Sequence, residues 1–275
     1  MTGVANHLEG WRLRALIFSI VAAIAGYLAF SLWGGWQEVV TAFMQIGLIG
    51  TLIALSLSLV NYGLRFGRWQ LYLWQLGHPV VWAPSLRIYL SGFALTTTPG
   101  KAGEAFRGVL LKQRGVPFPV TFAAFISERL SDLVAIVLLT LVGLAQYPQA
   151  QGIVFADIVG IIGVLICLSS QTLLDRLHRW ASTRQGKLMA LIAHASEMLV
   201  GARRCHHPGL LGVATLISLI AWGAEALAFY WMLGWLGADI SLSFAIFVYA
   251  LSMLAGALSF LPGGLGSAEA VMISL

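Results

Sequence analysis

The chain has 275 residues, of which 59% are apolar and only 10% are charged, and its mean hydropathy is +0.86. Soluble domains are about 45–50% apolar and about 25% charged, so this composition excludes a water-soluble globule. The formal net charge of +5 does not indicate a nucleic-acid binder, because no binding module or basic patch interleaved with aromatic residues is present. Continuous apolar runs of about 20 residues are typical of membrane helices and not of barrel strands. The composition therefore predicts an all-α polytopic membrane protein.

Five apolar runs predict membrane-spanning helices. They cover residues 15–33, 46–64, 119–145, 153–170 and 209–236. The first run follows Arg12 and Arg14 and ends without a small-residue cleavage site, so we expect a retained helix and not a signal peptide. The second run is expected to continue as an amphipathic helix from Arg65 to Trp74.

Threading these spans back and forth sorts nearly all lysines and arginines to one side. The opposite loops carry only Glu38, Asp157 and Asp239. The positive-inside rule then places the N-terminus and the segment 171–208 in the cytoplasm and predicts a multi-pass protein of the cell membrane. With its interspersed charges, that segment is expected to form a surface helix pair, either a solvated linker or a dock for anionic lipid.

Residues 79–118 begin and end on the cytoplasmic side in this topology. Their apolar core, Ile88 to Thr98, covers roughly 16 Å as a helix and cannot cross a hydrocarbon layer of ~30 Å. We interpret the segment as a re-entrant hairpin that turns between Pro99 and Gly103. A hairpin lying on the membrane surface is the alternative.

A second Pro-Gly-x-x-Gly turn, also followed by a glutamate, begins at Pro262. It comes after a span that exits on the outer side, so we predict two repeats, 1–145 and 146–275, of inverted topology. The first repeat has two spans, a re-entrant hairpin and one span, and the second has two spans and a hairpin. The last helix is expected to be cut short at Leu275, with the natural chain continuing. Residues 241–261 could cross the membrane fully, which would break the symmetry.

The tract from Ser127 to Asp132 places three ionisable residues roughly 15 Å into a span. Charged groups at that depth are costly unless they are paired, and they are functional candidates by default. Glu128 and Asp132 share a helix face, and Arg129 can reach Asp132 at i+3. The tract is either a structural ion pair between helices or part of a polar substrate path.

Five further charged residues are candidates. Glu225 lies mid-span without a local basic partner, so it must pair across helices, be protonated or face water. Arg68 and Arg107 lie nearer the cytoplasmic edge, where they either hold a headgroup or snorkel toward the membrane surface. Glu104 and Glu269 lie where helices restart after the glycine turns, at N-termini suited to phosphate. They either cap those helices or bind an amine or a proton.

Three tracts carry a likeness to a known family. They are Pro99-Gly-Lys-Ala-Gly-Glu104-Ala-Phe-Arg107, Glu128-Arg129-x-x-Asp132 and Leu261-Pro-Gly-Gly-Leu-Gly266-x-x-Glu269. Together they resemble the lysylphosphatidylglycerol synthase transmembrane-region family, over nearly the whole chain. The resemblance implies a flippase-like domain whose relatives are linked to aminoacylated phosphatidylglycerol, hopanoids or polyprenyl-linked sugars. The chain has no soluble aminoacyltransferase domain, so lysyl transfer is not carried over.

We therefore expect a lipid flippase of the bacterial or archaeal cytoplasmic membrane, moving an anionic or aminoacylated phospholipid or a polyprenyl-linked lipid. No enzymatic activity, metal or other cofactor is expected, because the histidines lack metal-ligand spacing and no nucleophile elbow or P-loop is present. A lipid-modifying enzyme and an accessory subunit of a lipid aminoacyltransferase or glycosyltransferase remain the alternatives. The candidate substrate-binding residues are Arg68, Pro99, Gly100, Gly103, Glu104, Arg107, Glu128, Arg129, Asp132, Glu225, Pro262, Gly263, Gly264, Gly266 and Glu269.

Overall fold

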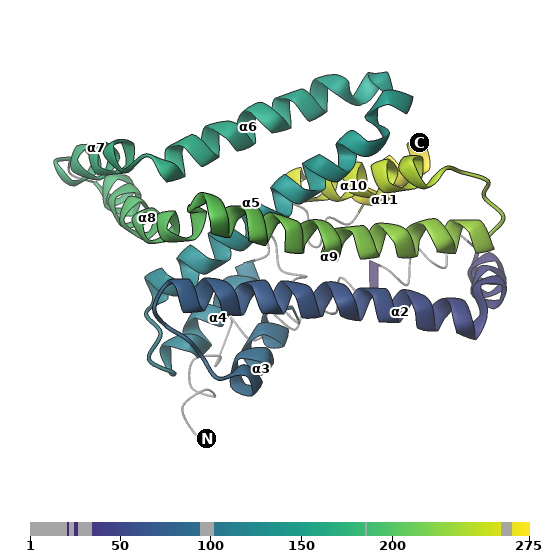
Figure 1. Ribbon diagram of the computed structural model, residues 1–275, viewed down its shortest axis with the longest axis horizontal. Helices are drawn as coiled ribbons and strands as arrows, with labels where there is room; N and C mark the ends of the chain where they lie inside the picture. The colour runs from purple at the N-terminus through teal and green to yellow at the C-terminus, as the bar shows by residue number, and fades with distance from the viewer. Residues whose placement is uncertain (1–20, 22–24, 27–34, 94–101, 185, 260–265) are drawn as a thin grey trace.

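The computed structural model is built from helices throughout the residues that it describes, which confirms the predicted all-α fold (Figure 1). These residues are 21, 25–26, 35–93, 102–184, 186–259 and 266–275. The helices are α2 (Trp36–Gln75), α3 (Trp82–Phe93), α4 (Ala102–Lys112), α5 (Phe118–Gly143), α6 (Gln151–Ser169), α7 (Gln171–Ser182), α8 (Lys187–Arg203), α9 (Pro208–Trp235), α10 (Leu242–Leu258) and α11 (Ser267–Ser274). Short 3-10 turns are η3 (Leu144–Gln146), η4 (Pro148–Ala150) and η5 (Arg204–His206).

Among the described residues, two helices, α2 with 40 residues and α9 with 28, are long and apolar enough to cross a membrane. A third crossing results if α6 and α7, which are bent by 78° at their junction, count as one span. The predicted spans 46–64, 153–170 and 209–236 coincide with parts of α2, α6 and α9. The span predicted at 119–145 corresponds to α5, which is about 39 Å long and carries three charged residues in its interior. The run 15–33 lies almost entirely outside the described residues.

The long helix α2 is bent at Gly47, whose backbone has a φ of +66° and a ψ of −178°. This left-handed region favours glycine, so the bend has a clear local cause. After Gly47 the helix continues without a break through Arg65 to Gln75. The predicted continuation of the second span as a helix is therefore confirmed.

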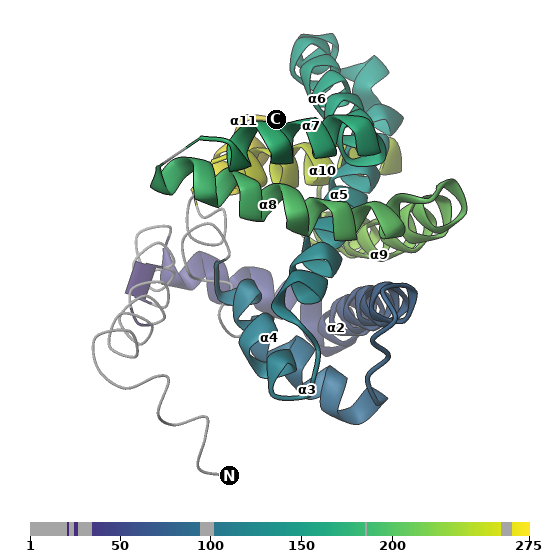
Figure 2. The ribbon, with the colours of Figure 1, turned by 90° about the vertical axis from the view of Figure 1, so that its left-hand side faces the viewer.

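Helices α2 and α9 lie side by side and run antiparallel (Figures 1 and 2). Near the C-terminal end of α2, Gln75 Nε2 donates a hydrogen bond to the carbonyl oxygen of Arg204, just before α9 begins (3.5 Å). At the middle, Asn61 Nδ2 donates to the carbonyl oxygen of Ala221, 160 residues later in the chain (2.9 Å). The basic helices α7 and α8 gather at the α2 C-terminal end of the molecule, in keeping with the one-sided charge distribution (Figure 1).

Each of the two long helices, α2 and α9, is followed by a pair of shorter helices, and the two connections are similar. The pair α3 and α4 follows α2, and the pair α10 and α11 follows α9 near the opposite end of the bundle (Figure 1). In both connections a glycine with positive φ ends the long helix, Gly77 at +81° and Gly237 at +89°. The tips of both predicted hairpins, 94–101 and 260–265, lie outside the described residues. The depth at which these hairpins enter a membrane stays a prediction.

An aromatic pair joins the long helix to the first helix of each hairpin. The ring centroids of Trp69 and Tyr89 lie 5.9 Å apart at 43°, and those of Phe229 and Tyr249 lie 5.9 Å apart at 46°. Each residue of the second pair follows its counterpart by the same 160 residues that separate the hydrogen-bonded pair at the crossing of α2 and α9. The two hairpin connections thus correspond at a constant offset along the chain, and the division into inverted repeats stays a prediction.

The packing of α5 on α10 provides a test of the fold at Gly143. A Cβ atom there would lie 2.5 Å from the Cβ of Phe247 and 2.6 Å from the carbonyl oxygen of Ser243. We expect Gly143→Ala to destabilise the protein by roughly 1–3 kcal/mol through overpacking, seen as a lower melting temperature in detergent.

Gly160→Ala in α6 is the matched control. A Cβ at Gly160 would meet no atom within 4 Å among the described residues, leaving aside neighbouring residues and the helix's own backbone. Helix propensity alone should then leave the stability unchanged or raise it by up to about 1 kcal/mol. Equal melting temperatures for the two variants would contradict the close approach of α5 and α10.

Candidate functional site

A stripe of polar residues follows one face of α2. Its members alternate between spacings of three and four residues: Ser58, Asn61, Arg65, Arg68, Tyr72 and Gln75. The four central members are at most 6% exposed, so this face points into the bundle. Apolar side chains on the other side of the same helix, Leu52 and Leu59, are more than half exposed. The helix thus presents its apolar face outward and its polar face inward, as expected in lipid.

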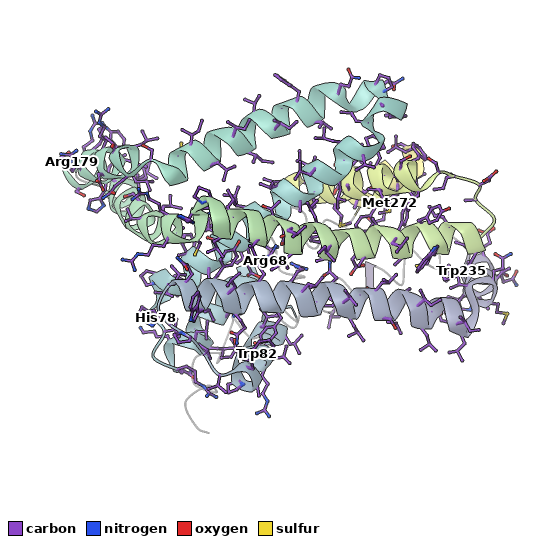
Figure 3. The ribbon with its side chains drawn as sticks, in the orientation of Figure 1. Arg68, His78, Trp82, Arg179, Trp235 and Met272 are labelled. Carbon is purple, nitrogen blue, oxygen red and sulfur yellow. The ribbon has the colours of Figure 1, made fainter. Side chains whose placement is uncertain are left out.

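Asp132 on α5 is the centre of the site. Its Oδ1 accepts hydrogen bonds from Arg68 Nη1 at 2.7 Å and from the indole Nε1 of Trp222 at 2.9 Å. Its Oδ2 lies 3.5 Å from Arg65 Nη2 and 3.3 Å from Arg129 Nη2. One carboxylate therefore serves three guanidinium groups and connects α2, α5 and α9. Arg68 lies between α2 and α9 (Figure 3).

Glu128, one turn earlier on α5, forms the second acidic position and is fully buried. Its Oε2 accepts a hydrogen bond from Arg107 Nη1 at 3.0 Å, and its Oε1 accepts one from the hydroxyl of Tyr89 at 3.2 Å. Arg68 Nη2 lies 3.8 Å from Oε1. Through these contacts Glu128 connects the hairpin helices α3 and α4 to α2 and α5.

Arg107 is held by aromatic rings as well as by Glu128. Its Cζ lies 4.8 Å from the ring centroid of Trp69 and 4.7 Å from that of Tyr89. Gly92 leaves room for it, because a Cβ there would come within 2.8 Å of the arginine side chain. Such cation–π contacts stabilise a desolvated guanidinium by about 2 kcal/mol.

The alternative that Arg68 and Arg107 snorkel toward the membrane surface is wrong. Arg68 is 0% exposed and Arg107 is 1% exposed. Each guanidinium finds a carboxylate inside the bundle, on Asp132 or Glu128, so it does not need to reach water. Arg65, Arg68 and Arg107 therefore share one site with Arg129 inside the bundle.

We call the six residues Arg65, Arg68, Arg107, Glu128, Arg129 and Asp132 the arginine cluster. Four guanidinium groups and two carboxylates meet in it. The side chain of Arg129 is 24% exposed, whereas the other three arginine side chains are at most 7% exposed. Arg129 makes the predicted i+3 contact with Asp132 and is also the most accessible arginine of the cluster.

Glu225 lies apart from the arginine cluster, in a groove of about 320 Å³ between α2 and α9. Its Oε1 accepts a hydrogen bond from Ser58 Oγ on α2 at 3.0 Å, so it does find a partner across helices. Thr51 and Tyr249 line the same groove with apolar side chains around them. Ser58 precedes Arg65 by two helical turns, which places the groove about 10 Å along α2 from the cluster.

The remaining predicted residues lie at the N-terminal ends of α11 and α4 or outside the described residues. Glu269 caps α11, since its Oε2 accepts the backbone N–H of Gly266 at 2.8 Å, which agrees with the capping alternative. Gly103 and Glu104 lie in the first turn of α4, where the structure describes the backbone of Glu104 and not its side chain. Outside the described residues altogether lie Pro99, Gly100, Pro262, Gly263 and Gly264.

Several residues of the site were not predicted, chiefly Arg65, Tyr72 and Tyr89. Tyr72 donates to Ser131 Oγ at 3.1 Å, and the other two contact the acidic pair directly. The missed signal for α2 was the alternation of three and four residues between its polar positions, which marks one buried helix face. For Tyr89 no local signal existed, because its partner Glu128 lies on another helix.

The arrangement suits the binding of an anion. Guanidinium groups form bidentate hydrogen bonds to phosphate and are more weakly hydrated than ammonium groups. Within the described ranges, no group of three His, Cys, Asp or Glu side chains could hold a metal ion. With four guanidinium groups and two carboxylates, the cluster carries an excess of positive charge.

Comparison with known proteins agrees with this description. The family model for the lysylphosphatidylglycerol synthase TM region matches residues 15–275, as the sequence motifs predicted. A UPF0104 membrane protein of Methanothermobacter thermautotrophicus is 26% identical over 266 residues, covering 90% of this chain and 79% of the relative. A UPF0104 membrane protein of Pyrococcus horikoshii is 21% identical over 286 residues, covering 93% and 85%. No solved structure matches the chain significantly.

The two classes of carboxylate should respond differently to neutralisation. Asp132→Asn leaves three guanidinium groups around a neutral amide, and breaking a buried ion pair costs roughly 3–5 kcal/mol. Glu225→Gln retains a carbonyl oxygen for Ser58, so we expect a change below about 1 kcal/mol. Melting temperatures of the two variants in the same detergent test this. A Glu225→Gln variant as unstable as Asp132→Asn would show that Asp132 is not the structural centre.

Proposed function

Since the chain belongs to the lysylphosphatidylglycerol synthase transmembrane-region family, we propose that it moves a lipid with an anionic headgroup between the leaflets of the cytoplasmic membrane. It does so without covalent chemistry on the lipid. In this proposal the lysine- and arginine-rich end faces the cytoplasm. The lipid substrate is the principal partner, and a lipid aminoacyltransferase or glycosyltransferase supplies it.

The observation that carries this proposal is the gathering of four arginines inside membrane helices. A charged side chain at the centre of a bilayer costs about 2.5–3.5 kcal/mol or more, so such residues are rarely placed there without a use. Two carboxylates would suffice to lock two arginines, yet four converge on them. A phosphate group entering the cluster would meet an electrostatic environment that already favours negative charge.

The polar stripe of α2 gives such a headgroup a route. From Ser58 to Gln75 it measures about 26 Å along the helix, against a hydrocarbon layer of ~30 Å. The stripe begins at the Glu225 groove, passes the arginine cluster and ends near η5. A headgroup that follows it can exchange water for side-chain hydrogen bonds, while its acyl chains stay in the bilayer.

Arg129 is the residue that we assign to first contact with the headgroup. Its side chain is partly exposed, in contrast to Arg65, Arg68 and Arg107. Its Cζ lies 5.7 Å from the ring centroid of Phe125, which steadies the guanidinium. Its Nε and Nη2 are buried, yet the side chain as a whole is the most exposed of the four, so we expect its loss to affect binding more than folding.

The test uses Arg129→Gln in proteoliposomes that contain fluorescent lipids of several headgroups, with dithionite quenching as the readout of lipid movement. We expect the wild-type protein to move anionic lipids faster than phosphatidylcholine. Arg129→Gln should slow the anionic lipids at least tenfold, because charge-assisted hydrogen bonds are worth about 1.5–3 kcal/mol each. Its melting temperature should stay close to that of the wild-type protein.

Arg184→Gln serves as the control variant. Arg184 is an exposed arginine that stacks on Trp180 at 4.6 Å and lies outside the arginine cluster. Its loss should leave both lipid movement and melting temperature unchanged. Normal movement of anionic lipids by Arg129→Gln would overturn the assignment of the cluster, and a collapse of the fold would give Arg129 a structural role.

A further inference from the structure

A second polar cavity lies away from the arginine cluster, where η5 joins α8 to α9. It has a volume of about 640 Å³. Its polar lining consists of Gln75, Gln171, Arg203, Arg204, His206 and His207. It lies beside the last residue of α2, so it adjoins the end of the polar stripe.

His206 lines this cavity and carries a buried hydrogen-bond acceptor. The residue is only 6% exposed, and its Nδ1 lies 2.7 Å from the carbonyl oxygen of Ala202. A carbonyl can only accept, so Nδ1 carries the ring proton. Burial lowers the pKa of His206 below its ordinary value of 6.5, which keeps the ring neutral near pH 7. Its Nε2 is then an acceptor, and no described residue donates a hydrogen bond to it.

The rest of the cavity supplies positive charge and donors. Arg203 and Arg204 are both exposed, and Arg203 Nη1 donates to Gln171 Oε1 at 2.7 Å. His207 Nδ1 accepts the backbone N–H of Gly209 at 3.3 Å, which leaves Nε2 as a donor. The N-terminus of the 28-residue helix α9 adds the positive end of its dipole.

We propose that this cavity binds a phosphate ester that carries a free hydroxyl group. The phosphate would contact Arg203, Arg204 and the N-terminus of α9, as anions do at helix N-termini. The hydroxyl would donate a hydrogen bond to His206 Nε2. A buried polar atom needs such a partner to offset the cost of its desolvation. The ester is either a lipid headgroup or a soluble compound. As a lipid headgroup it would wait here before passing along the polar stripe, and that role rests on the proposed function.

Binding is measured with the full chain in detergent, using four probes. Glycerol 3-phosphate and ethyl phosphate, titrated calorimetrically, are soluble esters with and without a hydroxyl. Phosphatidylglycerol and phosphatidylmethanol, followed by native mass spectrometry, are the matching lipids. Whichever of the two pairs binds, soluble or lipid, we expect its hydroxylated member to bind roughly tenfold more tightly than the other. That difference is the equivalent of one good hydrogen bond.

Variants locate the binding. Arg204→Gln should weaken both members of the bound pair roughly tenfold, and His206→Leu should abolish the preference for the hydroxyl. Arg184→Gln is the control for a general loss of basic charge, and Arg129→Gln should bind normally even if it fails to move lipid. Binding of the soluble pair alone would identify a soluble ligand, and binding of the lipid pair would identify a headgroup. Binding of neither pair, or affinities that Arg204→Gln and His206→Leu leave unchanged, would overturn the proposal.

Discussion

The pairing of four guanidinium groups with two carboxylates inside the bundle is the constraint around which this protein is assembled. Asp132 and Glu128 lie one turn apart on α5, and between them they contact side chains of α2, α3, α4 and α9. Water cannot solvate a guanidinium in lipid, so each of these contacts offsets part of a large desolvation cost. The positions of the helices around α5 are therefore set by charge as much as by apolar packing.

The groove at Glu225, the arginine cluster and the cavity at η5 are three parts of one arrangement. The polar stripe of α2 connects them, because its residues contact Glu225 at one end, Asp132 in the middle and the backbone of Arg204 at the other end. The chemistry changes along this line from a carboxylate with hydroxyl groups, through guanidinium groups, to basic side chains near the surface. A single helix face thereby offers successive sites to a polar group inside an apolar bundle.

Hydropathy and charge sorting predicted much of the fold, because the physical cause of each long helix is local. The apolar composition of the runs in α2, α6 and α9 is enough to predict these helices. The i+3 contact of Arg129 with Asp132 follows from helix geometry. The partners of Arg68 and Arg107 could not be predicted in this way. Arg68 meets Asp132 across 64 residues, and Glu225 meets Ser58 across 167, so no local pattern encodes either contact. The topology based on basic residues placed Arg68 and Arg107 near the cytoplasmic edge of the membrane. It did so because their partners lie on other helices and leave no local signal in the sequence.

The dependence of α2 on later parts of the chain has a consequence for biogenesis. Arg68 is synthesised 64 residues before Asp132 and 150 residues before Ser218, to which it also donates a hydrogen bond. When α2 leaves the ribosome, two arginines of its polar face therefore have no counter-ion yet in the chain that follows them. The helix must remain at an interface, or in a protein-lined passage, until α5 has been made. The order of synthesis thus makes α5 the element on whose arrival the final insertion of α2 depends.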